Sequence, residues 1–575
     1  MKKLIPLLAA ALVLAGGILL PLLFLKSERS LARDAWHLKP PLENAAEMIA
    51  VLPSARQLAH AETEFYAFFH FGINTFYEVE WGTGGEDPMR FDPTNLDTDQ
   101  WAASIAAAVM KGAIITAKHH DGFCLWPSAY TEFSVKNSPY QGDVVGEMAE
   151  SCRKYGLKFG FYLSPWDMNA PTFGQDEAYN DYYAAQLTEL LTNYGDVFAV
   201  WLDGAIGEEY KDRQTYDFPR WTEIIRELQP DACITIMGSP PDVAWVGNEH
   251  GLADGNVSSV GRWGLVWTKN ECDVSIRPGW FYHADQQPKS LKQLIHIYYN
   301  SVGMNCTLLL NIPPNKEGLL DQQDVDRLAE FGEAIRAIYA NEIPTVMTPL
   351  TEDGGMYAYD LKLDARQKVK HLVLSEDVEN YSERVTRFSV YAKVGGFYVK
   401  AGQSQSAGAK TIVQLSRFAP RTDTYRVVIE EARGEPAAQV KLYGGGAAES
   451  SPGRPANPRI DRAADELLGR FEAYEEYPGY AGQGSERAAI WTDKSLKNFR
   501  YIEVGYEIAG DEIILHPGKT LHSIAELTPG RPFVTTFWVP EIIPVNGIAF
   551  TGSDGRHGEI LHRQRELRGR LSAAH

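Results

Sequence analysis

Between about residues 60 and 345, hydrophobic and polar positions follow one repeated order. An amphipathic helical segment leads through a turn, usually at a glycine, into a short apolar run that ends in a polar loop. The apolar runs are AIITAK (113–118), FGFYLS (159–164), VFAVWLD (197–203), CITIMG (233–238) and TLLLNI (307–312). They are continuously apolar, which is typical of strands covered on both faces. Helix and strand units about 40 residues apart predict a parallel sheet.

The helical segments carry recognisable end signals. Thr98 and Asp99 begin the segment WAASIAAAVMK, which we expect to end at Gly112. DVVGEMAESCRKY (143–155) and EAYNDYYAAQLTELLTNY (177–194) are followed directly by Gly156 and Gly195. Asp or Ser near a helix start and Gly just after its end are the usual capping residues.

Polar and aromatic residues gather where the apolar runs end. They are His70, His119, His120, Asp121, Tyr162, Ser164, Asp203 and the loop after Ile236. In a (β/α) barrel this rim is the active face, and an open doubly wound sheet places its chemistry there too. The chain has no GxGxxG or GxxxxGK[ST] motif to hold a nucleotide. We therefore predict an α/β fold, a (β/α)8-like TIM-type barrel at residues 50–345.

The pattern changes after residue 345. Short strand-like runs separated by turn residues predict a β-sandwich at residues 346–443. The stretch GGGAAESSPGRPANP predicts a linker at 444–460. An additional small β-rich C-terminal domain of unknown role is expected at 461–560, and residues 561–575 are expected to form a basic tail, frayed or helical.

The N-terminus resembles an export signal. Lys2 and Lys3 precede an apolar run from Leu4 to Leu25, long enough to span a bilayer. Ser30-Leu31-Ala32 is a mediocre cleavage site. Residues 1–32 are therefore either a cleaved signal peptide or a membrane anchor, and both readings stay open. Either one predicts an exported chain, periplasmic, cell-surface or secreted, with membrane attachment in the second case.

Charge and cysteine content narrow the function. The net charge is −20 and the pI near 5.2, which disfavours binding to nucleic acid. Five cysteines lie without CxxC or CxxH spacing, so we expect buried free thiols and no zinc module. Aromatic residues make up 11% of the chain, which weakly favours a sugar-binding cleft.

Asp203, in WLDG, is the sharpest chemical feature. A carboxylate at the active rim suits a retaining glycosidase, whose nucleophile attacks the anomeric carbon, although it could also cap the following loop. For His119-His120 three roles stay open: sugar binding, structure and metal ligation. Adjacent strand residues point to opposite faces, which makes the pair a poor bidentate ligand. Glu80-Trp81 could grip and cover a sugar, or be ordinary loop residues.

Retaining hydrolysis needs a second carboxyl group as general acid and base. Glutamates on rim loops could supply it, and spacing does not choose among Glu80, Glu208, Glu209, Glu249 and Glu271.

Seven ordered motifs together resemble the α-L-fucosidases of glycoside hydrolase family 29. They are FFHFGINTFYEVEWG, KHHDGFCLW, FGFYLSPWD, VWLDG, WVGNEHG, RPGWFYH and NCTLLLNIPPN. The resemblance covers about residues 60–345, and more loosely extends to 443. It implies a distorted barrel followed by a β-sandwich, and hydrolysis with retention through a covalent fucosyl intermediate. The unit after residue 460 matches nothing recognisable.

The resemblance also assigns roles. It implies Asp203 as nucleophile and, for the branch with EWG and VGNE motifs, Glu249 as acid/base and α-1,3/1,4-linked fucose as substrate. The 46-residue step from Asp203 to Glu249 fits the next barrel loop. The implied fucose pocket comprises His70, Glu80, Trp81, His119, His120, Tyr162, Trp201 and Trp280, the last beside the fucose methyl.

The predicted partner is thus a fucosylated oligosaccharide or glycoprotein glycan, and no metal or other cofactor is expected. Two rival hypotheses remain: a non-catalytic carbohydrate-binding surface protein, and a glycosidase for a related sugar such as α-L-galactoside.

Overall fold

The computed structural model describes residues 25–36, 39, 45–236, 242–255, 257–260, 266–352 and 355–445, and the backbone of the strands between residues 484 and 572. The chain divides into two compact units, Met1–Ala447 and Ala448–His575. Most of the N-terminal apolar run and most of the expected linker lie outside the described residues. Within the described part, no helix is long and apolar enough to cross a membrane.

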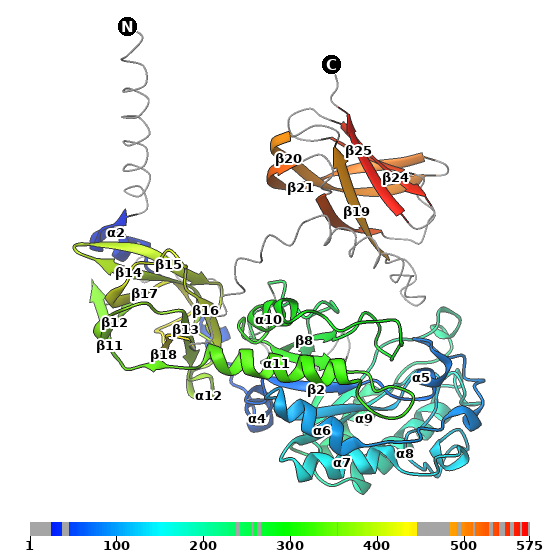
Figure 1. Cartoon of the computed structure of the whole chain (residues 1–575). Coiled ribbons are helices and arrows are strands. Elements are labelled where there is room, and N and C mark those ends of the chain that lie inside the picture. The colour runs from blue at the N-terminus through cyan, green and yellow to red at the C-terminus, as the bar shows by residue number, and fades with distance from the viewer. Residues whose placement is uncertain are drawn as a thin grey trace. The chain divides into compact units, whose positions relative to one another are not determined.

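A closed parallel barrel forms the first part of the larger unit (Figure 1). Its strands, in chain order and barrel order, are β2 (Phe65–Phe69), β3 (Gly112–Lys118), β4 (Lys158–Leu163), β5 (Ala199–Leu202), β6 (Cys233–Ile236), β7 (Val243–Trp245), β8 (Lys269–Ser275) and β9 (Thr307–Asn311). β9 pairs with β2 to close the barrel. The predicted TIM-type fold is confirmed.

Helices on the outside of the barrel connect most of these strands. They are α5 (Ile73–Tyr77), α6 (Thr98–Ala107), α7 (Val144–Lys154), α8 (Glu177–Asn193), α9 (Phe218–Leu228), α10 (Leu291–Asn300) and α11 (Gln322–Ile338). The described residues between β6 and β8 contain no helix. The barrel is therefore irregular on this side, as the resemblance implied.

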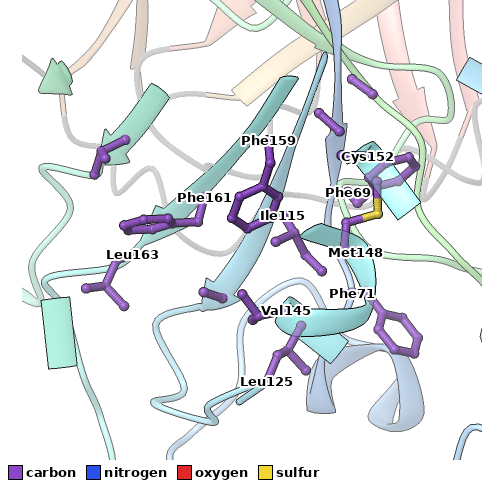
Figure 2. Packing of buried hydrophobic residues seen from close by; sticks show 14 of the residues in the cluster. Phe69, Phe71, Ile115, Leu125, Val145, Met148, Cys152, Phe159, Phe161 and Leu163 are labelled. Carbon is purple, nitrogen blue, oxygen red and sulfur yellow. The ribbon is translucent and has the colours of Figure 1, made fainter. Parts of the chain in front are cut away.

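Alternate residues of each barrel strand serve two cores. In β2, Phe65 and Phe69 belong to the large cluster between strands and helices, whereas Tyr66 and Phe68 face a second cluster inside the barrel. Figure 2 shows the outer cluster, in which Phe69, Ile115 and Phe161 pack with Met148 of α7. Both faces of the strands are buried, which explains the continuously apolar runs.

The helix ends follow the capping prediction with one exception. Asp143 accepts a hydrogen bond from the Gly146 amide, and Gly156 has a φ of +68° just beyond α7. α6, however, ends at Ala107 rather than beside Gly112. Gly112 instead begins β3, where a Cβ atom would lie 2.9 Å from the Lys158 carbonyl oxygen. That glycine permits close strand approach and does not cap the helix.

The predicted β-sandwich is present after the barrel. One sheet has the order β1 (Leu25–Lys26), β15 (Phe397–Ser404), β14 (Val385–Val394), β17 (Thr422–Ala432), β12 (Gly355–Gln367) and β11 (Thr345–Glu352). The other has the order β10 (Glu342–Ile343), β18 (Ala438–Tyr443), β13 (His371–Glu376) and β16 (Thr411–Gln414). The short helices α3 (Ala45–Ile49), α4 (Ala55–Ala61) and α12 (Val378–Tyr381) complete the described larger unit, together with α2 (Glu28–Asp34). The two sheets enclose a core that includes Leu372, Phe388 and Leu442.

The second unit is β-rich, as predicted. A five-stranded sheet has the order β22 (Phe533–Val539), β19 (Gly484–Thr492), β25 (Glu566–Ser572), β24 (His557–Arg563) and β23 (Gly547–Thr551), and β20 (Leu496–Ala509) pairs with β21 (Glu512–Leu527). The expectation of a frayed or helical tail after residue 560 is wrong. The alternation of Leu567 and Leu571 with Arg568 and Arg570 suits a strand, and β25 pairs on both sides.

Candidate active site

The polar residues predicted at the strand ends do meet at one end of the barrel. His70 follows β2, His119 and His120 follow β3, Asp203 follows β5, and Trp280 lies in the loop after β8. The His70 ring lies 5.0 Å from the Trp280 ring between centroids. The Tyr162 ring of β4 lies 6.2 Å from that of His70 and 5.9 Å from that of His119. The structure therefore brings together side chains from five segments of the chain, a mostly aromatic cluster that we call the pocket.

Asp203 is held in place through both carboxylate oxygens. Its Oδ2 accepts a hydrogen bond of 2.9 Å from the Tyr162 hydroxyl, and its Oδ1 accepts one of 2.8 Å from the Ala205 amide. The His120 Nε2 lies 4.0 Å from Oδ2. The side chain is 14% exposed, so it remains open to the pocket. The second contact also makes Asp203 the cap of its loop, the alternative role left open by the sequence.

His120 is fixed in one tautomer by its neighbours. The Ser164 hydroxyl donates to the Trp166 carbonyl oxygen at 2.8 Å, so it accepts from the His120 Nδ1 at 2.7 Å. In a neutral ring the other nitrogen, Nε2, is then an acceptor on the side of Asp203. Burial lowers the pKa of His120, and the Asp203 charge partly opposes this shift. The ring is thus a neutral acceptor suited to a hydroxyl group.

His70 has a comparable arrangement at the end of β2. The Asn311 Oδ1 accepts from the His70 backbone amide at 3.0 Å and lies 2.9 Å from its Nδ1. The Asn311 Nδ2 donates to the Ser275 hydroxyl and the Trp280 carbonyl, which assigns Oδ1 as the acceptor. His70 Nδ1 therefore carries the proton and Nε2 is the acceptor. Burial lowers the pKa of His70 to about 3.

His119 lies beside His120 with ring centroids 4.1 Å apart. The expectation that the two point to opposite faces is wrong, because β3 ends at Lys118 and strand alternation no longer applies. The Asn74 amide nitrogen lies 3.5 Å from the His119 Nδ1, and burial holds the pKa of His119 well below its usual range. Among the described residues, no three His, Cys, Asp or Glu side chains are grouped to hold a metal ion.

Trp81 forms an aromatic wall next to His120. Its ring meets the His120 ring edge-on at 5.4 Å and the Trp166 ring edge-on at 5.3 Å. Trp166 also packs against His120 at 5.2 Å. The motif FGFYLSPWD contains Trp166, but its contribution to the pocket was not predicted. An indole that follows a strand end in a polar loop was the available signal.

Glu80 is committed to the loop that carries Trp280. Its Oε2 accepts from the backbone amides of Trp280 and Phe281 at 2.9 and 3.2 Å, and its Oε1 lies 2.8 Å from the His283 Nε2. The hydrogen bond to Glu80 raises the pKa of His283. A Cβ atom on Gly279 would lie 2.2 Å from Oε1, so a larger residue there would displace the Glu80 carboxylate. In this structure Glu80 positions the loop, and His283, the last residue of the motif RPGWFYH, was not among the predicted site residues.

Glu249 contacts the same pocket and has fewer hydrogen-bond donors around it than Asp203. Its Oε2 accepts a hydrogen bond of 3.2 Å from the Trp280 indole nitrogen. Burial raises the pKa of Glu249 to about 7; the hydrogen bond from Trp280 has the next largest effect and lowers this pKa, and the charges of Asp203 and Glu80 raise it by smaller amounts. Glu249 follows β7, two strands after Asp203. The expectation of the next barrel loop is wrong, because Val243–Trp245 forms a short strand of its own.

The other candidate glutamates lie elsewhere. Glu271 is fully buried within β8 and accepts hydrogen bonds from the Tyr66 hydroxyl and, at 2.8 Å, from the Trp201 indole. It holds the floor of the pocket below Trp201. Glu208 and Glu209 lie in an exposed 3-10 turn, where Glu208 pairs with Lys211. Of the five candidates, Glu249 is the one that contacts the side chain of Trp280 and whose pKa is raised by the Asp203 charge.

A further buried acid, Asp273, was not among the predicted residues. It follows Glu271 by two positions on β8, so both side chains enter the barrel interior. Its Oδ1 accepts from the Trp245 indole at 2.7 Å, and burial and the Glu249 charge hold its pKa well above the usual range. The polar sequence KNECDVS does not resemble a buried strand, which is why this residue was missed.

Two carboxyl groups among aromatic side chains, at the active rim of a closed parallel barrel, are typical of a barrel glycosidase. The family profile for Alpha-L-fucosidase matches residues 56–337. The chain belongs to this family, the α-L-fucosidases of glycoside hydrolase family 29.

Individual relatives extend this result. Alpha-L-fucosidase 1 of Arabidopsis thaliana is 45% identical over 317 residues, which are 51% of this chain and 62% of that protein. The chain thus spans somewhat under two thirds of the Arabidopsis relative. A relative from Oryza sativa subsp. japonica is 41% identical over 65% of this chain and 74% of its own length. The crystal structure of SpGH29 is 35% identical, with a TM-score of 0.64, and covers 69% of this chain and 99% of that one.

Proposed function

We propose that this chain is a retaining, exo-acting α-L-fucosidase that hydrolyses terminal α-1,3/1,4-linked L-fucose from oligosaccharides or glycoconjugates by double displacement. The observation that carries the proposal is the contrast between its two carboxyl groups. Asp203 accepts hydrogen bonds on both oxygens, whereas burial and neighbouring charge raise the pKa of Glu249 to about 7. Such a pair suits one nucleophile and one proton donor.

In the first step Asp203 attacks C1 of the fucosyl unit, and Glu249 donates its proton to the leaving oxygen as the glycosidic bond breaks. The product of this step is a fucosyl ester on Asp203 and a released alcohol. Glu249, now a carboxylate, then takes a proton from water, which attacks C1 and releases Asp203. Both inversions together retain the anomeric configuration.

Substrate binding follows from the fixed histidine tautomers. The Nε2 atoms of His70 and His120 are acceptors without charge, so sugar hydroxyls can donate to them. The His120 acceptor lies 4.0 Å from Asp203, which places a hydroxyl held there beside the reacting carbon. Trp280 offers an apolar surface, and family resemblance assigns it to the fucose methyl. The linkage preference rests on the EWG and VGNE motifs alone.

The decisive experiment is azide rescue, followed by product stereochemistry. Asp203→Ala should abolish hydrolysis of an aryl α-L-fucoside, and azide should restore turnover with β-fucosyl azide as product. Glu249→Ala should give α-fucosyl azide instead, because the nucleophile is intact and only the acid/base is missing. Glu208→Ala, on the exposed turn, is the matched control and should hydrolyse normally. Normal activity of Asp203→Ala would refute the assignment.

A substrate panel tests the finer specificity. Lewis-type trisaccharides with α-1,3 or α-1,4 fucose should be cleaved, and 2′-fucosyllactose should not. Preference for the α-1,2 linkage would contradict the proposed specificity for α-1,3/1,4-linked fucose. A higher kcat/KM for an aryl α-L-galactoside than for the aryl α-L-fucoside would favour a glycosidase for a related sugar. If fucose were released from none of these α-fucosides, the alternative of a non-catalytic carbohydrate-binding protein would be favoured.

A further inference from the structure

The residues directly after the N-terminal apolar run are part of the folded β-sandwich. Leu25 and Lys26 form β1, which pairs with Val399 and Tyr398 of β15 at the edge of the six-stranded sheet. Helix α2 follows at once, with Ser27 as its N-cap. We call residues 25–36 the N-terminal clasp. It comes from near the N-terminus of the sequence, 349 residues or more before the strand β14 (Val385–Val394) that it helps to cover.

The apolar side of the clasp is fully engaged. Leu31, Ala32 and Ala35 are at most 2% exposed. They form one buried cluster with aromatic and aliphatic side chains of the sheet, namely Tyr357, Ala358, Tyr391, Tyr398 and Val428. Removal of the helix would return these surfaces to water, at a cost set by the apolar area exposed.

The polar side of the clasp is engaged as well. Arg426 of β17 is 1% exposed and donates to Asp360 at 2.7 and 2.9 Å and to Glu28 of α2 at 3.1 Å. Lys26 pairs with Asp34 across the clasp. Without Glu28, the buried Arg426 would lose one of its two carboxylate partners, an unfavourable change for a desolvated charge.

This arrangement bears on cleavage at Ser30-Leu31-Ala32. A cut after Ala32 would remove β1, Glu28 and the buried Leu31, and would leave Ala35 on a stub of helix. The fold therefore requires the residues that such a cleavage would discard.

We propose that the N-terminal segment is retained and that its apolar run anchors the enzyme in a lipid bilayer. Residues 4–24 are apolar throughout, long enough to cross the hydrocarbon core, and preceded by Lys2 and Lys3, which favour the cytoplasmic side. The run leads into β1 with no intervening spacer. The sandwich is thus held directly at the non-cytoplasmic surface of this membrane. The enzyme then acts on fucosylated glycans close to that surface.

The test uses the full chain with a C-terminal tag, expressed in a Gram-negative bacterium. The membrane fraction is washed with 1 M salt and with alkaline carbonate (~ pH 11), and the N-terminus is identified by mass spectrometry. We expect a chain that retains residues 1–24, stays in the pellet and needs detergent for release. Release by either wash, or an N-terminus at Arg33 or anywhere beyond the apolar run, overturns the proposal.

Two truncations test the clasp separately from the fucosidase activity. A chain lacking residues 1–24 should be soluble, with unchanged kcat/KM and melting temperature. A chain lacking residues 1–32 should melt at lower temperature, and Leu31→Ala in the full chain should lower the midpoint by about 2–6 °C. Arg29→Ala, exposed on the same helix, is the control and should change little. Equal melting of the two truncations would overturn the structural role of the clasp.

Discussion

The hydrogen bond from Trp280 to Glu249 offers a sharp test of the acid/base assignment. As the proposed acid/base, Glu249 has to be protonated when the reaction starts, so kcat/KM should fall as pH rises through the pKa of Glu249, about 7. The Trp280 indole donates to the carboxylate form and lowers this pKa. Trp280→Phe removes the donor, so the pKa must rise and activity must persist to higher pH.

The size of the effect follows from the geometry. Hydrogen bonds to charged groups contribute about 1.5–3 kcal/mol. The 3.2 Å separation is longer than usual for a charge-assisted bond, so about 1 kcal/mol is reasonable here. At roughly 1.4 kcal/mol per pKa unit, the basic limb should move up by about 0.7 units. The backbone amide of residue 280 still donates to Glu80, so the loop is retained.

The assay is the pH dependence of kcat/KM with an aryl α-L-fucoside between about pH 4.5 and 9. Trp201→Phe is the matched control, because that indole donates to Glu271 below the pocket floor. Trp201→Phe should lower kcat/KM and leave the basic limb of the pH profile at the same pH. A basic limb that stays put in Trp280→Phe, or that moves to lower pH, would refute the role given to Glu249.

Two other predictions concern the hydrogen bonds by which Glu80 holds the Trp280 loop, and the β-sandwich. Gly279→Ala places a Cβ atom 2.2 Å from the Glu80 Oε1 and should reduce kcat/KM by about 10–100-fold, whereas Gly396→Ala, which has open space around it, should have no effect. Equal activities of the two variants would contradict the role of Glu80 in positioning the Trp280 loop. Burial raises the pKa of Glu376 to about 8, above its unfolded value of 4.5, so the folded state keeps a proton that the unfolded state has lost. Stability should therefore fall between about pH 4.5 and 8, by at most about 4–5 kcal/mol, and Glu376→Gln should flatten this decline in denaturant unfolding. A slope identical to that of the wild type would argue against a buried, protonated Glu376.

The barrel could be predicted where its strands are apolar on both faces. β3, β4, β5 and β9 are continuous apolar runs, because one face packs on helices and the other on the barrel interior. β8 could not be predicted in this way. Its residues are all buried, yet Lys269 bonds Asn305 and Glu271 bonds Trp201. Polar residues with partners far along the chain leave no local hydrophobic signal.

The same limit applies to the site. Residues at the ends of predicted strands were found, because a parallel barrel brings those ends together. The sequence could not choose among the glutamates, because the choice depends on how deeply each one is buried. Glu271 is fully buried, whereas Glu249 contacts Trp280 of the pocket. Asn311, which fixes both His70 and Trp280, ends a predicted strand and lies in the motif NCTLLLNIPPN, but the motif did not indicate a role for it. Its role depends on contacts 31 to 241 residues away in the sequence.

The uncharged histidines have a consequence for where the enzyme can work. An ordinary imidazole changes its charge in mildly acidic surroundings. The pKa values of His70, His119 and His120 are all lowered by burial, that of His70 to about 3. His70, which we propose to accept a sugar hydroxyl, therefore keeps the same donor and acceptor atoms when its surroundings become mildly acidic. In the proposed mechanism His70 helps to recognise the sugar and Glu249 supplies the proton, so mild acidity changes the protonation of Glu249 and leaves that of His70 unchanged.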